Sequence, residues 1–156
     1  DGVIMLLTEK ERTTIEDLRT QEKSCIMKYD RYSKEANDPV LGNLFKQLKE
    51  SEEKHFDTLG KVLNGENVCC NCNCNNGSEY SPKATYDKNE QTKEKQSDCF
   101  LVTDCIGTEK LVSGEYNSDV FVFGDSQVRK VLADIQVEEQ NHAEMLWKYK
   151  RVNGKA

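Results

Sequence analysis

The most constraining feature of this sequence is an internal repeat that includes its only two histidines. The second half of the chain repeats the first at an offset of 87 residues, so that His55 recurs as His142 and Glu52 as Glu139. The other recurring pairs include Glu22 and Glu109, Tyr29 and Tyr116, Asp38 and Asp125, and Leu59 and Leu146. This repeat predicts a chain built from two copies of one supersecondary unit.

Each half carries two apolar stripes with the three-and-four spacing of a helix that buries one face. The stripes run from Ile15 to Ala36, Leu41 to Val62, Leu101 to Phe123 and Val128 to Tyr149. Turn signals follow them at Asn37-Asp38-Pro39, Asn64-Gly65, Gly124-Asp125-Ser126 and Asn153-Gly154. Asp38 is expected to cap the second helix and Pro39 to lie in its first turn. Each half is therefore predicted to be a helical hairpin.

The hairpins are predicted at about residues 12–65 and 98–153, with an irregular insert at 66–98, all within one domain of residues 1–156. The insert loses the apolar periodicity and is rich in polar residues, so we expect it to cross the bundle as a long connection. The predicted fold is all-α: an antiparallel four-helix bundle with one long crossover between helices two and three.

Composition narrows the classes of partner. The net charge is −6 and the sequence has no basic stripe, so a nucleic acid is not expected to bind. No apolar run approaches 18 residues, so no membrane partner is expected. Seven cysteines are many for a reducing compartment, but Cys25 and Cys105 fall on the apolar stripes, where a thiol behaves as a small hydrophobe. We expect a reducing compartment, such as the cytoplasm, and a core that contains these two thiols.

Charged residues interrupt all four apolar stripes at positions where a hydrophobic residue is expected. Burial of an unpaired carboxylate is costly, so a glutamate in a core needs a cation, a partner or a proton. Two of the stripes carry a Glu-x-x-His pair, whose side chains lie on one helix face one turn apart. The six interrupting residues are Glu22, Glu52, His55, Glu109, Glu139 and His142.

The spacing of these residues brings them to one level of the bundle. Glu22 and Glu52 are each 15 residues from Asn37, and the second half has arms of the same length around Gly124. In an antiparallel hairpin, arms of equal length end side by side, about 22 Å from the turn. Four carboxylates at one level would repel, and two divalent cations would neutralise them. Mixed oxygen and nitrogen ligands suit iron or manganese.

These residues resemble those of the ferritin-like superfamily of di-iron carboxylate proteins, and within it rubrerythrin-type and bacterial spore-coat (coat F-like) proteins. The resemblance covers about residues 12–65 and 98–152. It implies that Glu52 and Glu139 bridge two metal ions and that each histidine binds one of them. It further implies that Glu22 and Glu109 are terminal ligands, and that a tyrosine in the position of Tyr29 or Tyr116 hydrogen-bonds a ligand carboxylate.

The chain also departs from rubrerythrin in two respects. Val112 stands where that family carries a further glutamate, three residues after the ligand of helix three. The rubredoxin tail of that family needs two Cys-x-x-Cys pairs, whereas Cys69-x-x-Cys72 is the only such pair here and lies in the insert. A peroxidase cycle with a built-in electron donor is therefore not predicted.

Two functions follow from the pattern. The first is redox chemistry of two bound iron or manganese ions with oxygen or peroxide, of the ferroxidase, peroxidase or manganese-catalase type, with an electron donor that the sequence does not identify. No catalytic residue beyond the metal ligands is predicted. The alternative is a structural spore-coat or assembly protein in which the metals are stabilising or vestigial. Either function is compatible with the expected homo-oligomer.

The insert contains a second group of candidate ligands. Four cysteines lie close together in the segment 69–74, in an arrangement that could bind a soft metal, form disulfides or leave loop thiols. These residues are Cys69, Cys70, Cys72 and Cys74.

Overall fold

The computed structural model of this chain describes residues 6–69 and 75–154. The helices are α1 (Glu9–Glu35), α2 (Pro39–Leu63), α3 (Asn76–Glu79), α4 (Lys93–Asp119) and α5 (Ser126–Val152), and a 3₁₀ turn, η1 (Val120–Val122), follows α4. The described residues form no strand. No helix in these two segments has the length and apolar character needed to cross a membrane.

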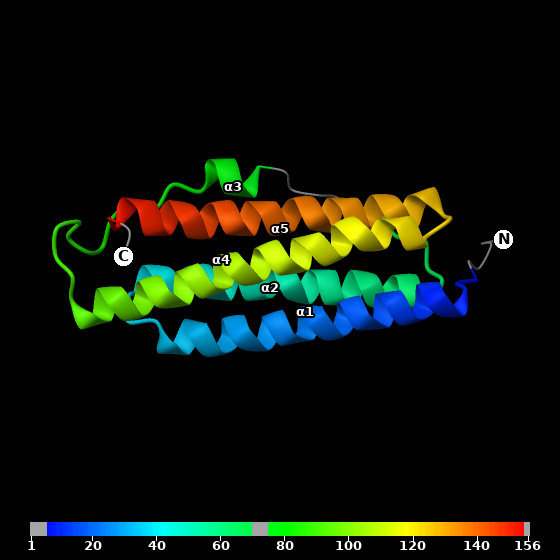
Figure 1. Cartoon of the computed structure of the whole chain (residues 1–156), viewed down its shortest axis with the longest axis horizontal. Coiled ribbons are helices and arrows are strands. Elements are labelled where there is room, and N and C mark those ends of the chain that lie inside the picture. The colour runs from blue at the N-terminus through cyan, green and yellow to red at the C-terminus, as the bar shows by residue number, and fades with distance from the viewer. Residues whose placement is uncertain (1–5, 70–74, 155–156) are drawn as a thin grey trace.

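The four long helices form two antiparallel hairpins that pack side by side (Figure 1). α1 pairs with α2 and α4 pairs with α5, while contacts of α1 with α4 and of α2 with α5 close the bundle. In the segment between α2 and α4, the described residues 75–92 place α3 over α5 and lead along the bundle to the start of α4 (Figure 1). This arrangement confirms the predicted all-α bundle with one long crossover.

Aspartates at the two turns begin the second helix of each hairpin. Asp38 caps α2 by accepting a hydrogen bond from the Val40 N–H at 3.0 Å, and Pro39 follows in the first turn, as the sequence predicts. Asp125 caps α5 in the same way, through the Val128 N–H at 3.0 Å. The two halves therefore share their turn chemistry as well as their apolar spacing.

Two predicted helix starts are too late in the sequence. α1 begins at Glu9 instead of about residue 12, because Thr8 and Glu11 form a reciprocal capping box. α4 begins at Lys93 instead of about residue 98, because the Thr92 hydroxyl caps it through the Lys95 N–H at 3.2 Å. The region that was predicted to be irregular, 66–98, also contains the short helix α3. Apolar periodicity misses these turns because their stability comes from caps and polar contacts.

Two buried polar residues of α4 fix the crossover and the first turn of the bundle. The Lys95 ammonium donates to three backbone carbonyl oxygens of residues 87–90, at 2.8 to 3.3 Å. Asp98 accepts hydrogen bonds from two backbone N–H groups of the 37–38 turn, each at 2.9 Å, and from the Tyr86 hydroxyl at 2.7 Å. Both side chains are fully buried, so these contacts replace their hydration.

The apolar core is divided into two clusters. One cluster contains Ile15, Leu59 and Ile135, and the other contains Phe45, Val102 and Leu146. Cys25 and Cys105 are buried in these clusters, which confirms their predicted place in the core. The six glutamate and histidine residues of the interrupted stripes belong to neither cluster and are nevertheless buried.

Two glycines inside α4 have no packing role within the chain. A methyl group added at Gly107 or Gly114 would meet no atom within 4 Å. Glycine within a helix is less stable than alanine by about 0.5–1 kcal/mol. We therefore expect Gly107→Ala and Gly114→Ala each to raise the free energy of unfolding by roughly that amount. Chemical denaturation of dilute protein measures this change. Gly42→Ala is the contrasting variant, because its methyl group would lie 3.1 Å from the Ser33 carbonyl oxygen.

Candidate metal centre

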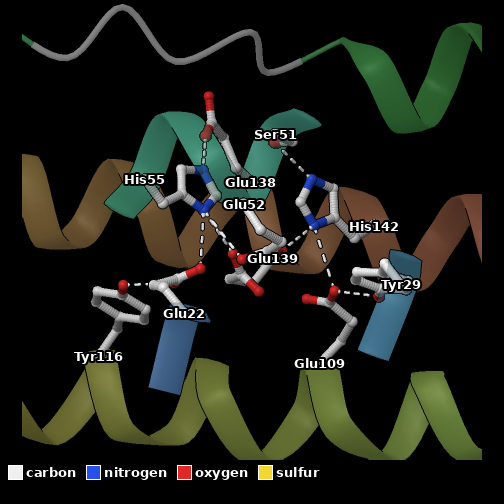
Figure 2. A network of polar contacts seen from close by, with 10 residues as sticks. All are labelled: Glu22, Tyr29, Ser51, Glu52, His55, Glu109, Tyr116, Glu138, Glu139 and His142. Carbon is white, nitrogen blue, oxygen red and sulfur yellow. Dashed lines mark hydrogen bonds and ion pairs between the residues drawn. The ribbon is translucent and has the colours of Figure 1, made fainter. Parts of the chain in front are cut away.

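All four long helices contribute side chains to one polar layer in the core (Figure 2). α1 and α4 contribute one glutamate each, and α2 and α5 contribute one glutamate and one histidine each. Each of the six residues is at most 3% exposed. They are the residues that interrupt the apolar stripes: Glu22, Glu52, His55, Glu109, Glu139 and His142.

The six residues form two overlapping groups of candidate ligands. In each group one ligand atom per residue lies within 4.8 Å of the others. Glu52 and Glu139 belong to both groups, whereas each of the other residues belongs to one: Glu22 and His55 to the first, Glu109 and His142 to the second. This geometry has the form that the resemblance implies, with two shared and two terminal carboxylates. Metal ligation by these residues stays a prediction.

Both histidines direct Nδ1 toward the carboxylates. His55 Nδ1 lies 2.9 Å from Glu139 Oε1 and 3.4 Å from Glu52 Oε2. His142 Nδ1 lies 2.9 Å from Glu52 Oε1 and 3.3 Å from Glu109 Oε1. The two rings stack with their centroids 5.9 Å apart. Each histidine therefore points a nitrogen at its own group of carboxylates.

The outer nitrogens of the histidines contact two residues outside the predicted set of ligands and tyrosines. His142 Nε2 lies 2.9 Å from the Ser51 hydroxyl oxygen, and His55 Nε2 makes a close contact with the Glu138 carboxylate (Figure 2). Ser51 and Glu138 are themselves related by the 87-residue offset, and each lies four residues before a histidine. That spacing places them on the histidine face of the helix and was a signal in the sequence.

Two tyrosines fix the terminal carboxylates from the opposite helix. Tyr29 of α1 donates to Glu109 Oε1 at 2.5 Å, and Tyr116 of α4 donates to Glu22 Oε1 at 2.6 Å. Each tyrosine thus serves the other hairpin, because α1 and α4 are antiparallel neighbours (Figure 1). Burial and the adjacent carboxylates raise the pKa of both phenols well above the usual range, so they stay protonated donors.

The layer contains seven buried atoms that lack a hydrogen bond, counted over the described residues. They are Glu22 Oε2, both carboxylate oxygens of Glu52, His55 Nδ1, Glu109 Oε2 and both carboxylate oxygens of Glu139. Some of them approach a neighbour at ion-pair distance, such as His55 Nδ1 at 2.9 Å from Glu139, but without hydrogen-bond geometry. Buried polar atoms in native proteins are rarely left in this state.

The layer also perturbs the protonation of its members. Burial and the neighbouring carboxylates raise the pKa of Glu22 and Glu139 well above its usual value. Burial acts in the same direction on Glu52, but contacts with Glu22 and both histidines outweigh it and lower the pKa of Glu52. Burial opposes the charged form of His142, yet the Glu109 and Glu52 carboxylates raise its pKa to about 10. Without a cation, protons must therefore balance the charge.

A surface pocket reaches the outer side of both histidines. Its lining includes Ser51 and His55 of α2 and Glu138 and His142 of α5. Cys69, an exposed thiol at the start of the predicted cysteine cluster, also lines this pocket. Small molecules in solvent thus have a route to the edge of the polar layer.

The other three members of the cysteine cluster, Cys70, Cys72 and Cys74, lie outside the described residues. A soft-metal site or a disulfide in this segment stays a prediction.

Comparison with known proteins gives one family match. Residues 97–154 match the family model of the Coat F domain, a span that includes most of α4 and all of α5. The matched region is less than half of the chain and contains Glu109, Glu139, His142 and Tyr116. No curated protein and no solved structure matches the chain. The match supports the spore-coat part of the resemblance.

The charge balance of the layer predicts the behaviour of metal-free protein. Glu139→Gln removes one buried carboxylate and preserves its shape, so we expect it to stabilise chelator-treated protein at pH 8 by about 1–3 kcal/mol. Urea denaturation measures the change. Glu144→Gln is the control, because the side chain of Glu144 is 41% exposed. Lower stability of the Glu139 variant than of wild type would contradict the expectation.

The stability measured by this urea denaturation should also depend on pH. In the folded chain the pKa values of Glu22, Glu139 and His142 are raised, so the folded state holds protons that the unfolded state releases. The stability of metal-free protein should therefore fall as the pH rises above the ordinary glutamate pKa of about 4.3. The Glu139→Gln variant should show a weaker decline.

Proposed function

We propose that this chain binds two metal ions in the core of its helical bundle. The observation that carries this proposal is the set of seven buried ligand atoms without hydrogen bonds, all on residues of the polar layer. A core that is apolar or fully hydrogen-bonded contains no such atoms. Cations bound at the polar layer would give each of these atoms a partner.

The donor set fits divalent transition metals. Four glutamates carry a formal charge of −4 when ionised, and two divalent ions would neutralise them. Carboxylate oxygens combined with imidazole nitrogens suit iron and manganese better than soft thiophilic metals. Glu52 and Glu139 would be shared by both ions, Glu22 and His55 would hold the first, and Glu109 and His142 the second.

Such a centre, when loaded, supplies electrons to oxygen or peroxide or disproportionates peroxide. The side chains of the polar layer would position the ions and balance their charge. Tyr29 and Tyr116 hold one oxygen of each terminal glutamate, which leaves the other oxygen of Glu22 and of Glu109 directed into the layer. Glu138 and Ser51 orient the histidines, and the pocket on their outer side gives a small oxidant access.

The family match favours a second, structural role. A Coat F domain over residues 97–154 suggests association with the spore coat. In that role the bundle is a building unit, and metal ions that bind only the folded state stabilise it by mass action. The exposed thiol of Cys69 is then available for crosslinks between units. Of the two roles, the comparison supports this one, and the enclosed polar layer supports the redox role.

Metal content tests the centre directly. Protein loaded with Fe(II) or Mn(II) under reducing conditions is expected to hold about two ions per chain by elemental analysis. Glu52→Ala should lose both ions because Glu52 is shared, while Glu22→Ala should lose mainly one. The control is Glu53→Ala, which changes the exposed neighbour of Glu52. Two ions retained in the Glu52 variant would disprove the assignment.

A peroxide titration separates the redox role from the structural role. Anaerobic protein loaded with Fe(II) is expected to consume about one peroxide for every two Fe(II), since each peroxide accepts two electrons. A loaded protein that melts at a markedly higher temperature than metal-free protein, but whose iron peroxide does not oxidise faster than free iron, would support the structural role.

The contacts of the outer histidine nitrogens predict that the two metal positions are unequal. His55 contacts a carboxylate, whereas His142 contacts a hydroxyl. A carboxylate partner makes a histidine a stronger ligand, and its removal typically lowers metal affinity 10- to 100-fold. We expect Glu138→Gln to weaken one position by roughly that factor and Ser51→Ala to weaken the other less. Competition with a chromogenic chelator measures both affinities, and equal effects of the two variants would contradict this expectation.

A further inference from the structure

The outward face of α4 carries large apolar side chains that the bundle does not cover. Phe100 is 68% exposed and Leu111 is 65% exposed, and Phe121 in η1 is 87% exposed. Phe100, Gly107, Gly114 and Phe121 follow one another at intervals of seven residues, which places them in one stripe along a helix. The buried residues of α4, such as Cys105 and Val112, lie on the opposite side.

No contact within the chain requires glycine at the two glycine positions of this stripe. Open space surrounds the position that a side chain would take at either Gly107 or Gly114. Together with Lys110 and Leu111 they line a shallow groove on the surface of α4. Small residues on a helix allow a second helix backbone to approach closely. A groove of glycines between exposed aromatic residues is therefore shaped for another helix.

We infer that this face is a two-fold interface in which α4 packs antiparallel against α4 of a second copy of this chain. The symmetry of the stripe identifies a second copy of the chain as the partner. The centre of the stripe lies between residues 110 and 111, and each member has a counterpart at the same distance on the other side: Phe100 with Phe121, and Gly107 with Gly114. A two-fold contact needs a surface that is complementary to itself.

In the symmetric arrangement, each exposed apolar side chain and each glycine of this face gains a contact in the second copy. Phe100 of one copy meets Phe121 of the other at both ends of the contact. Gly107 faces Gly114 of the second copy, so the backbones approach closely on each side of the centre. Leu111 meets Leu111 of the second copy at the axis and fills the space between the glycine pairs. The contact extends over residues 100–121, about 31 Å of helix.

Charge supports the same face. The chain has a net charge of −6, so two copies repel one another over most of their surface. The stripe is uncharged in a chain in which 32% of residues are charged. Lys110 and Glu115, which also line the groove, flank the stripe, and both are exposed, so their charged groups can stay in solvent. Within the described residues, α3 packs on α5, and Phe100, Leu111 and Phe121 stay exposed.

Sedimentation equilibrium of the full chain, in reducing and metal-free buffer, tests the interface. One helix pair is a small interface, so we expect a dimer with a dissociation constant on the order of micromolar. Leu111→Lys places two like charges at the axis and should weaken the dimer at least about tenfold. Met27→Lys is the matched control, because Met27 of α1 is also 65% exposed, and it should leave the dimer unchanged.

A second variant separates loss of the interface from loss of the fold. Gly114→Leu fills the groove with a good helix former, and nothing within the chain obstructs it. The variant should therefore melt no earlier than wild type by circular dichroism, yet lose the dimer. A chain that stays monomeric up to about 100 μM would overturn the inference. So would a dimer that neither Leu111→Lys nor Gly114→Leu weakens.

Discussion

The structure depends on keeping four carboxylates buried at one level of a helical bundle. Without partners, the four carboxylates would repel one another and would have lost their hydration, which is among the largest free-energy costs in a protein core. The surrounding residues respond to this constraint. Two histidines face the carboxylates, two tyrosines donate to the terminal pair, and apolar clusters exclude water on either side of the layer. Two cations, as proposed, would complete this balance.

The duplication explains why the balance is nearly symmetric. Equal arms on each hairpin set the level of the glutamates, and the antiparallel contact of α1 with α4 exchanges the tyrosines between the halves. The symmetry fails at the outer histidine nitrogens, where Glu138 stands in one half and Ser51 in the other. If the polar layer binds two metal ions as proposed, the two positions would therefore differ in ligand strength. A redox site could use that difference, whereas a purely structural site would not need it.

Sequence alone predicted the parts of this structure that depend on spacing along one helix. The bundle, the turns at Asp38 and Asp125 and the convergence of the six residues follow from a 3.6-residue period and equal arms. Parts that depend on contacts between elements were missed or predicted only in outline. The start of α4 rests on Thr92 and on polar groups that hold the crossover. The resemblance implied that Tyr29 and Tyr116 hydrogen-bond a carboxylate, but which glutamate each tyrosine reaches depends on which helices are neighbours. Periodicity carries no information on either.

The two faces of α4 show how one helix can meet two constraints. Its inner face supplies Glu109 and Tyr116 to the polar layer, so its rotation in the bundle is fixed by buried hydrogen bonds. That rotation directs Gly107, Leu111 and Gly114 to solvent. The centre of the outward stripe, between residues 110 and 111, adjoins Glu109, so the two-fold axis of the inferred dimer passes near the level of the polar layer. The interaction that orders the core thereby also positions the surface that a second copy would use.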